Sequence, residues 1–242
     1  MKSNHRIVCL FLLLLSVLST PAKTFLVSVG INDYSSFPDK LSNLLLPIND
    51  AKGITNVYTG NGSVEYVLLT DKKASKSAIK QAMKKVYSLA GKDDQLVLFF
   101  SGHGYSGGVC ASDGKLPYDE IKAIMSHYPC KTKLLLIDAC RAGGFRRIPS
   151  KSRTDLSTNT ALLFLASRDH ESSIERKDMK NGFFTQYLIN GLRGKADSNR
   201  DRLISAKELF DYVSERVILQ SNGLQHPVMW GNFNDSTTIM KW

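Results

Sequence analysis

The feature that most constrains the fold is an apolar run that ends abruptly in polar residues and glycines. Four apolar residues, Leu134–Ile137, are followed at once by Asp138, Cys140 and a glycine pair. A short apolar run of this kind is typical of a strand buried on both faces of a parallel sheet. Because chemistry in such sheets collects beyond the carboxyl ends of the strands, we expect Cys140 to lie at a functional edge.

A second stretch has the same construction. Residues 95–100 form another apolar run, which leads into Ser101, Gly102, His103 and Gly104. If the two strands are parallel neighbours, His103 and Cys140 project from adjacent strand ends toward a common cleft. A thiol is a poor nucleophile until it loses its proton, and a nearby imidazole is the usual base. The pair therefore predicts cysteine-based catalysis, whereas either residue alone would fit a buried thiol or a loop histidine.

These two motifs carry a resemblance to a known family. Gly-His-Gly after one strand and Asp-Ala-Cys-Arg-Ala-Gly (138–143) after the next resemble the caspase and metacaspase group of cysteine peptidases. Caspases have Gln-Ala-Cys-[Arg/Gln/Gly]-Gly, whereas this chain has Asp138 in place of the Gln and Ala142 before the glycine. The Asp form is found in metacaspases and bacterial caspase-like peptidases. The resemblance covers nearly the whole chain after residue 23. It implies a three-layer α/β/α fold with a mainly parallel sheet of about six strands.

Residues 1–22 are expected to be a secretory signal peptide rather than part of the fold. Lys2 and Arg6 precede an apolar run over 7–18, and small residues around Ala22 suit a signal peptidase. The run is shorter than the roughly 20 residues that a membrane-spanning helix needs, so we expect no stable membrane insertion. We expect residues 23–242 to form a single caspase-like peptidase domain that acts outside the cytoplasm, secreted or periplasmic.

Composition agrees with a globular enzyme. Hydrophobic residues make up 43% of the chain and charged residues 22%. The formal net charge is +10, and removing Lys2 and Arg6 with the signal peptide lowers it from +10 to +8. Because the Lys and Arg residues are dispersed, solvated surfaces explain them better than a nucleic-acid partner does. No cluster of His and Cys has metal-ligand spacing, which excludes a metallopeptidase.

Strand and helix patterns alternate along the chain, which predicts a parallel sheet with helices on both faces. Strands are predicted over 25–30, 64–69, 95–100, 134–137 and 160–166, with a hairpin around Asp113 and an edge strand over 225–230. Helices are predicted over 51–58, 75–91, 118–126, 183–192 and 205–219. Asn49 and Asp50 are expected to cap the first helix.

Two acids are candidates for substrate recognition. Asp138 lies two residues before Cys140, and Asp50 begins a helix at the same sheet edge. Carboxylates that line one pocket repel each other unless a cation lies between them, so a Lys or Arg side chain is the natural guest. By resemblance, metacaspases bind a P1 Arg or Lys through an Asp at each of these positions and through the Ser before Gly-His-Gly, here Ser101. The alternatives are a helix cap for Asp50 and a hydrogen-bonded strand-end acid for Asp138.

Amide cleavage also needs donors for the negative charge of the tetrahedral intermediate. The resemblance places this oxyanion hole at the backbone N–H groups of Gly104 and Cys140. The expected enzyme uses Cys140 as nucleophile and His103 as base, requires no cofactor and cleaves proteins or peptides with a basic P1 residue. Two other classes fit the motifs: a catalytically silent caspase-like binding module, and a legumain- or gingipain-like hydrolase or transpeptidase. The presence of both nucleophile and base argues against the silent module. The sequence carries no signal for an oligomeric state.

Residues 197–208 match the spacing of a calcium-binding EF-hand loop, with side-chain oxygens at positions 1, 3, 5, 9 and 12. However, position 6 is Arg202, where the tight turn needs glycine. Ser205 and Glu208 also fit a Ser-x-x-Glu capping box for the last helix. Both interpretations remain open, and a structural turn is favoured over a calcium site.

Residues 141–158 interrupt the alternation with a polar loop that carries Arg146, Arg147, Lys151 and Arg153. A peptidase that prefers basic P1 residues would find its own substrate there, so self-cleavage within residues 146–153 is a hypothesis. The alternative is a solvated connection. Cys110 and Cys130 could pair in an oxidising compartment or remain buried thiols.

Overall fold

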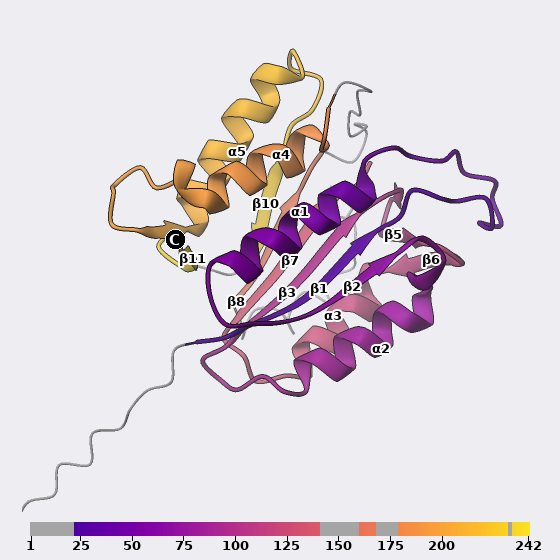
Figure 1. Ribbon diagram of the computed structural model, residues 1–242, viewed down its shortest axis with the longest axis horizontal. Coiled ribbons are helices and arrows are strands. Elements are labelled where there is room, and N and C mark those ends of the chain that lie inside the picture. Colours follow the sequence, from indigo (N-terminus) through magenta and orange to yellow (C-terminus); the bar gives the residue numbers. More distant parts are fainter. Residues whose placement is uncertain (1–21, 141–159, 168–178, 232–233) are drawn as a thin grey trace, which may run out of the picture.

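The centre of the molecule is a six-stranded sheet with the strand order β10-β8-β7-β3-β1-β2 (Figure 1). The computed structural model describes residues 22–140, 160–167, 179–231 and 234–242. Five strands are parallel, and β10 is antiparallel to β8. Their bounds are β1 (Thr24–Gly30), β2 (Val64–Thr70), β3 (Gln95–Ser101), β7 (Thr132–Asp138), β8 (Thr160–Leu165) and β10 (Val228–Gly231). The expected mainly parallel sheet of six strands is confirmed.

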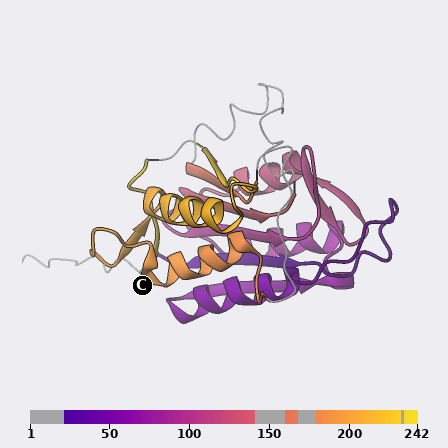
Figure 2. The ribbon, with the colours of Figure 1, turned by 90° about the horizontal axis from the view of Figure 1, so that it is seen from above.

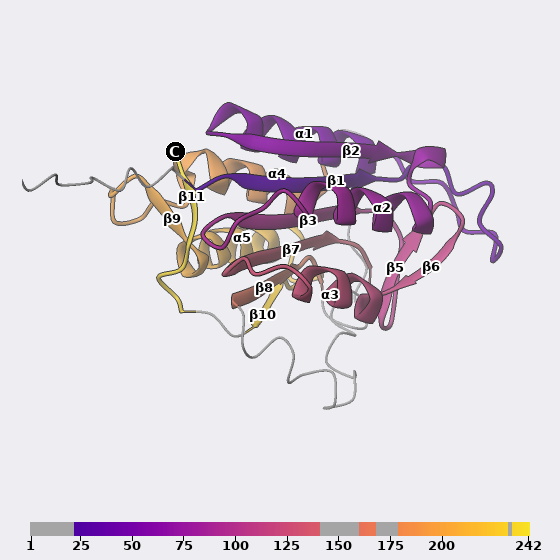
Figure 3. The ribbon, with the colours of Figure 1, turned by 90° about the horizontal axis from the view of Figure 1, so that it is seen from below.

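Helices cover both faces of this sheet. One face carries α1 (Pro47–Gly60), α4 (Phe183–Asn190) and α5 (Ala206–Gln220), which lie side by side in Figure 2. The other face carries α2 (Lys76–Tyr87) and α3 (Tyr118–Ser126), which lie in front of the strands in Figure 3. The two faces correspond to two separate apolar clusters. The expected three-layer architecture is therefore confirmed.

Alternation along the strands decides which side chains face which layer. Leu98 and Leu135 pack toward α2 and α3, whereas Phe99 and Leu136 pack toward α1, α4 and α5. Because successive side chains of a strand point to opposite faces, the last residues of β3 and β7 fall on the α1 and α4 side. The fold thus directs two polar strand ends toward the same pair of helices.

The smaller elements lie at the two ends of the sheet. After β3 the chain forms a three-stranded antiparallel sheet of β4 (Gly104–Tyr105), β5 (Gly108–Ala111) and β6 (Gly114–Pro117), which contains the predicted hairpin around Asp113. A short 3₁₀ turn (Asp71–Lys73) precedes α2, and an irregular turn (Gly191–Lys195) follows α4. Near the C-terminus, β9 (Leu203–Ser205) pairs with β11 (Thr238–Lys241).

The expected cap of the first helix is wrong. Helix α1 begins at Pro47 and its N-cap position is Leu46, so Asp50 lies inside the first turn. Proline is well suited to the first turn of a helix because its missing N–H would be unsatisfied there in any case. Asp50 is consequently free of a capping role in its own helix and reaches toward the sheet. By contrast, Ser75 caps α2 by accepting the Ala78 N–H at 3.1 Å.

Among the described residues, no helix combines the length and apolar character needed to cross a membrane. Residues 1–21 of the predicted signal peptide lie outside the described residues. The same holds for the predicted processing segment, 146–153.

Candidate active site

The two motif-bearing strands are direct neighbours. Strands β3 and β7 are parallel, and their register pairs Ser101 with Asp138. The Gly102 N–H continues the pairing by donating to the Asp138 carbonyl at 3.1 Å. His103 and Cys140 each lie two residues beyond the paired positions. The two residues therefore leave adjacent strands at the same carboxyl edge of the sheet, as expected.

A close backbone approach links the histidine motif to the cysteine. A Cβ added to Gly104 would overlap the carbonyl oxygen of Cys140 and lie 3.0 Å from the Ala139 Cβ. Only glycine allows the chain after His103 to pass this near to the chain at Cys140. The structure thus brings together Gly104 and Cys140, the two residues expected to form the oxyanion hole.

The His103 ring is held by a backbone carbonyl. Its Nε2 lies 2.7 Å from the carbonyl oxygen of Ser42, in the loop between β1 and α1. Because a carbonyl only accepts hydrogen bonds, Nε2 carries the proton, and the neutral ring keeps Nδ1 unprotonated. Nδ1 is thereby the atom able to accept a proton. No sequence signal points to Ser42, since any residue supplies a carbonyl.

Tyr34 contacts both the backbone and the ring of His103. Its hydroxyl accepts the backbone N–H of His103 at 2.9 Å and donates to the Cys110 carbonyl at 3.0 Å. The Tyr34 and His103 rings meet edge to face, with centroids 4.7 Å apart and planes at 63°. Burial raises the pKa of Tyr34 far above its usual value, so the hydroxyl stays a donor. A Cβ on Gly102 would overlap this hydroxyl, which explains the glycine before His103.

Asp50 is buried at the same sheet edge, and its hydrogen-bond donors among the described residues are neutral groups. Its Oδ2 accepts the Ser101 hydroxyl at 2.8 Å. Its Oδ1 accepts the Asn181 side-chain amide at 2.9 Å and the Gly182 N–H at 3.1 Å. The pairing of Asp50 with Ser101 agrees with the set expected from sequence, whereas Asn181 and Gly182 were not among the candidates.

Asp138 lies beside Asp50 at the start of α4. Its Oδ2 accepts the Thr185 hydroxyl at 2.7 Å and the Thr185 N–H at 3.2 Å. A Cβ added to Gly182 would lie 3.0 Å from Oδ2 of Asp138 and 3.5 Å from Oδ2 of Asp50. The two carboxyl groups therefore converge on Gly182. Asp138 is also a hydrogen-bonded strand-end acid, so the structural alternative for this residue holds beside the functional one.

Burial gives Asp50 an unusual affinity for protons. Removal from water raises the pKa of its carboxyl group from 3.8 to about 8, and repulsion by Asp138 acts in the same direction. Hydrogen bonds from Asn181, Ser101 and Gly182 lower the pKa but do not outweigh burial. A cation between the two acids would favour their ionised forms.

The described cysteines differ in accessibility. Cys110 and Cys130 are buried and not bonded to each other. Burial raises the pKa of the Cys110 thiol to about 11, which makes it a poor nucleophile. Cys140 is only partly buried. Of the thiols that the structure describes, Cys140 is therefore the one suited to attack a substrate.

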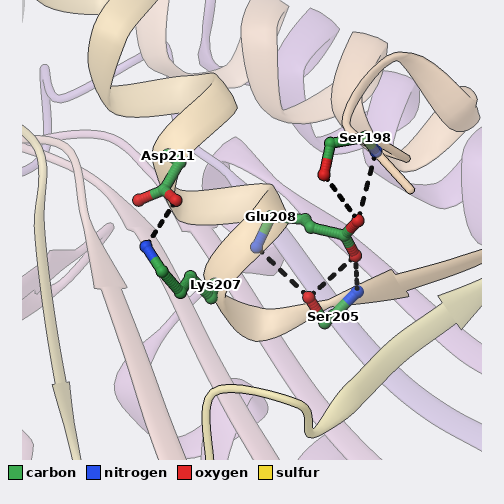
Figure 4. A network of polar contacts seen from close by, with 5 residues as sticks. All are labelled: Ser198, Ser205, Lys207, Glu208 and Asp211. Carbon is green, nitrogen blue, oxygen red and sulfur yellow. Dashed lines mark hydrogen bonds and ion pairs between the residues drawn. The ribbon is translucent and has the colours of Figure 1, made fainter.

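The loop at residues 197–208 is organised around Glu208 (Figure 4). One carboxylate oxygen of Glu208 accepts the Ser198 N–H and hydroxyl, and the other accepts the Ser205 N–H and hydroxyl. Because the Ser205 hydroxyl also accepts the Glu208 N–H, the predicted capping box is confirmed. Arg202, at position 6, has φ of 64° in the left-handed region. Among the described residues, no group of three or more His, Cys, Asp or Glu side chains is arranged to hold a metal ion.

A cavity of about 410 Å³ lies at the opposite, amino-terminal end of the parallel strands, lined by Lys23, Tyr58, Gln95 and Ile239 among others. His103, Cys140 and the two buried acids do not contribute to it. This cavity is therefore separate from the candidate active site at the carboxyl edge of the sheet.

The three-layer fold, with Gly-His-Gly and Asp-Ala-Cys at the ends of adjacent strands, is typical of a caspase-like domain. The family model for the caspase domain matches residues 25–237, and the chain belongs to this family of cysteine peptidases. No curated protein sequence matches the chain. Similar solved structures include a protein from Geobacter sulfurreducens (TM-score 0.64, 19% identity, covering 86% of this chain and 92% of that one). Another is caspase-1 from Spodoptera frugiperda (TM-score 0.65, 16% identity, covering 90% and 88%). At these identities the structures support the fold.

Proposed function

We propose that the protein is a cysteine endopeptidase in which Cys140 is the nucleophile and His103 the general base. The observation that carries this proposal is the orientation of the His103 ring. Its Nε2 is engaged by the Ser42 carbonyl, which leaves Nδ1 as the basic atom at the sheet edge that also carries Cys140. Tyr34 supports the same orientation by packing edge to face against the His103 ring and by accepting the backbone N–H of His103.

In the proposed reaction, Nδ1 of His103 takes the proton of the Cys140 thiol. The thiolate attacks the substrate carbonyl carbon and forms a C–S bond, and the resulting oxyanion accepts hydrogen bonds from the Gly104 and Cys140 N–H groups. Collapse of the intermediate breaks the C–N bond, and His103 gives its proton to the leaving amine. Water then hydrolyses the thioester, with His103 as base, and restores the thiol.

The proposed substrate preference is Arg or Lys at P1. Two buried carboxyl groups converge on Gly182, and the hydrogen-bond donors to Asp50 are all neutral. A guanidinium or ammonium group would bring a positive charge to the two acids, and a guanidinium can bridge two carboxylates. Asp50, Ser101 and Asp138 are the substrate-binding residues of this proposal. No step requires a cofactor.

The decisive test compares peptides that differ only at P1, with Arg, Lys, Asp or Leu at that position. Turnover of the Arg and Lys peptides should fall by on the order of 10³-fold or more in Cys140→Ala and in His103→Ala. Circular dichroism should show that both variants remain folded. Wild-type turnover in Cys140→Ala would overturn the mechanism, and efficient cleavage only after Asp would overturn the specificity. Mass spectrometry of the products, with an added amine, separates hydrolysis from transpeptidation.

Two further parts of the proposal rest on the sequence. We place the mature protein outside the cytoplasm after removal of residues 1–22, and we propose self-cleavage within residues 146–153. The basic residues of that segment match the preference proposed for the site. Intact-mass analysis of the wild type beside Cys140→Ala tests this step. Cleavage after a basic residue should appear in the wild type only, and a fully active but uncut wild type would show that processing is not needed.

A further inference from the structure

The loop between β1 and α1, residues 31–46, holds His103 at two separate places. Near the start of the loop, the Tyr34 hydroxyl accepts the backbone N–H of His103, and the two rings meet edge to face with centroids 4.7 Å apart. Near its end, the Ser42 carbonyl oxygen lies 2.7 Å from Nε2 of His103. The orientation of the proposed base therefore depends on how two parts of one loop are held relative to each other.

The backbone makes two successive turns between these contacts. The Phe37 N–H donates to the Tyr34 carbonyl at 2.9 Å, and the Lys40 N–H donates to the Phe37 carbonyl at 3.1 Å. Lys40 has φ of 50°, in the left-handed region that non-glycine residues adopt mainly in turns. The chain thus returns toward Tyr34, and Asn43 contacts it from nine residues away in sequence.

A side-chain hydrogen bond of Asn43 joins the two parts of the loop. Oδ1 of Asn43 accepts the backbone N–H of Tyr34 at 2.9 Å. Asn43 directly follows Ser42, whose carbonyl engages the histidine ring, and Tyr34 carries the hydroxyl that engages the histidine backbone. Asn43 itself is exposed, so its side chain does not fill the core. One amide oxygen therefore connects the two contacts of His103.

The base of the loop is closed by other groups, centred on Asn32. The Oδ1 atom of Asn32 accepts the Ile48 N–H at 2.9 Å, and its Nδ2 donates to the Leu45 carbonyl at 3.0 Å. Its backbone carbonyl accepts the Leu44 N–H at 2.9 Å. None of these bonds uses the Asn43 side chain. Truncation of Asn43 should consequently loosen the inner part of the loop and leave its base closed.

We propose that Asn43 is a positioning residue, which holds Tyr34 and Ser42 at the separation that keeps Nδ1 of His103 available to the Cys140 thiol. The inference rests on the proposed function, because the orientation of the base matters only if His103 activates Cys140. Without the Asn43 oxygen, the Tyr34 N–H would bond to water and the Ser42 carbonyl would lose its fixed place at Nε2. Since proton transfer needs the base within hydrogen-bond reach of the thiol, the chemical step should slow while substrate binding is retained.

The first measurement separates kcat from KM, with the peptide that the wild type cleaves fastest. Asn43→Ala should lower kcat by about tenfold and leave KM within about twofold of the wild-type value. Asn43→Asp keeps an oxygen that accepts the Tyr34 N–H and should restore kcat to within about twofold of wild type. Asn56→Ala, the matched control, removes the same side chain from an exposed position of α1 and should behave like the wild type. Equal melting temperatures would show that all three variants are folded.

The second measurement reports on the base without any substrate. Iodoacetamide alkylates the thiolate form of a cysteine, and mass spectrometry of the Cys140 peptide gives the rate at this residue. Near pH 7, His103→Ala sets the rate for a thiol that lacks its base. Asn43→Ala should be alkylated at a rate between this value and the wild-type rate, whereas Asn43→Asp and Asn56→Ala should match the wild type.

The outcomes separate this inference from the proposed function. Wild-type values of kcat and of the alkylation rate in Asn43→Ala would overturn the positioning role and leave the proposed function in place. The same would follow from a rise in KM at unchanged kcat, or from an equal loss of kcat in Asn43→Asp. A wild type that cleaves no peptide, and whose Cys140 is alkylated no faster than in His103→Ala, would overturn both.

Discussion

Two acidic clusters of this protein, the buried pair Asp50 and Asp138 and the loop around Glu208, both contain carboxyl groups. The pKa of Asp50 is raised, whereas the pKa of Glu208 is lowered. Asp50, buried beside Asp138, has its pKa raised to about 8 by burial and by the neighbouring charge. Partial burial alone would also raise the pKa of Glu208, but hydrogen bonds from Ser205 and Ser198 outweigh it and lower the pKa to about 2. Glu208 is thus satisfied by its own loop as an anion, whereas the hydrogen bonds that Asp50 accepts do not outweigh its burial. The difference separates an acid held by its own loop from the acid that we propose to bind a cationic side chain.

For these two clusters, the largest expected effect comes from removing a carboxyl group from the buried pair. Asp138→Ala should lower kcat/KM for an Arg peptide by on the order of 10²–10³-fold, mainly through KM, because a desolvated cation would lose its partner. Glu208→Ala is the matched control and should leave kcat/KM unchanged. An equal loss of kcat/KM in Asp138→Ala and Glu208→Ala would contradict a functional difference between the two clusters. Because Thr185 loses its hydrogen-bond acceptor in Asp138→Ala, the melting temperature of each variant is measured to show that a loss of activity does not come from unfolding.

The pH dependence of stability sharpens the comparison. The folded pKa of Asp50 is raised from 3.8 to about 8, so between these values the folded state holds a proton that the unfolded state releases. Stability from this group is present at low pH and is lost as pH rises toward 8. From pH 6 to 8 the free energy of unfolding should fall by about 2 kcal/mol, and Asp50→Asn should remove most of this fall. Urea unfolding at both pH values measures it, and an equal slope in wild type and variant would contradict the prediction.

Glu208 should show the opposite pH dependence and a comparable or smaller effect. Its folded pKa is lowered from 4.5 to about 2, so its contribution to stability is present above 4.5 and is lost as pH falls toward 2. At neutral pH, Glu208→Ala should cost about 1–2 kcal/mol, because the capping box of α5 and the bonds to Ser198 disappear. Asp211→Ala, which removes an exposed ion pair with Lys207, should cost less than about 0.5 kcal/mol. Thermal unfolding ranks the two, and the reverse order would contradict this account.

The same contrast shows which parts of the site can be predicted from sequence. His103, Cys140 and Asp138 are visible because apolar runs of buried strands end in reactive side chains at one sheet edge. Ser42 contributes only a carbonyl, and Tyr34 is one aromatic residue in a loop, so neither has a distinguishing side-chain pattern. Thr185 of α4, and Asn181 and Gly182 just before this helix, reach the acids from a segment that is far away in sequence, and none of them is charged. Their roles follow only from the way α4 packs beside α1.

The position of Asp50 was the misleading case. Its side-chain type, directly after Asn49, is typical of a helix cap, but Pro47 starts α1 one turn earlier. Asp50 then lies on the helix face that packs against the sheet, and its carboxyl group meets Ser101 there. Asp50 could have capped the helix or contacted the sheet. Because the helix begins at Pro47, Asp50 contacts the sheet.

The smallest expected effect concerns calcium at the loop 197–208. Both oxygens of Glu208 already accept hydrogen bonds, one from Ser198 and Asn199 and the other from Ser205. An EF-hand needs this side chain as a bidentate ligand. Asp197 also accepts the Arg202 N–H and the Trp242 indole N–H. Calcium at about 1 mM, enough for extracellular sites, should therefore leave the melting temperature unchanged. Binding at this loop would instead raise it by mass action, in the wild type but not in Asp197→Asn or Glu208→Gln. Such a selective rise would assign the second acidic cluster to a cation after all, and the raised pKa of Asp50 would then be the remaining difference between the two clusters.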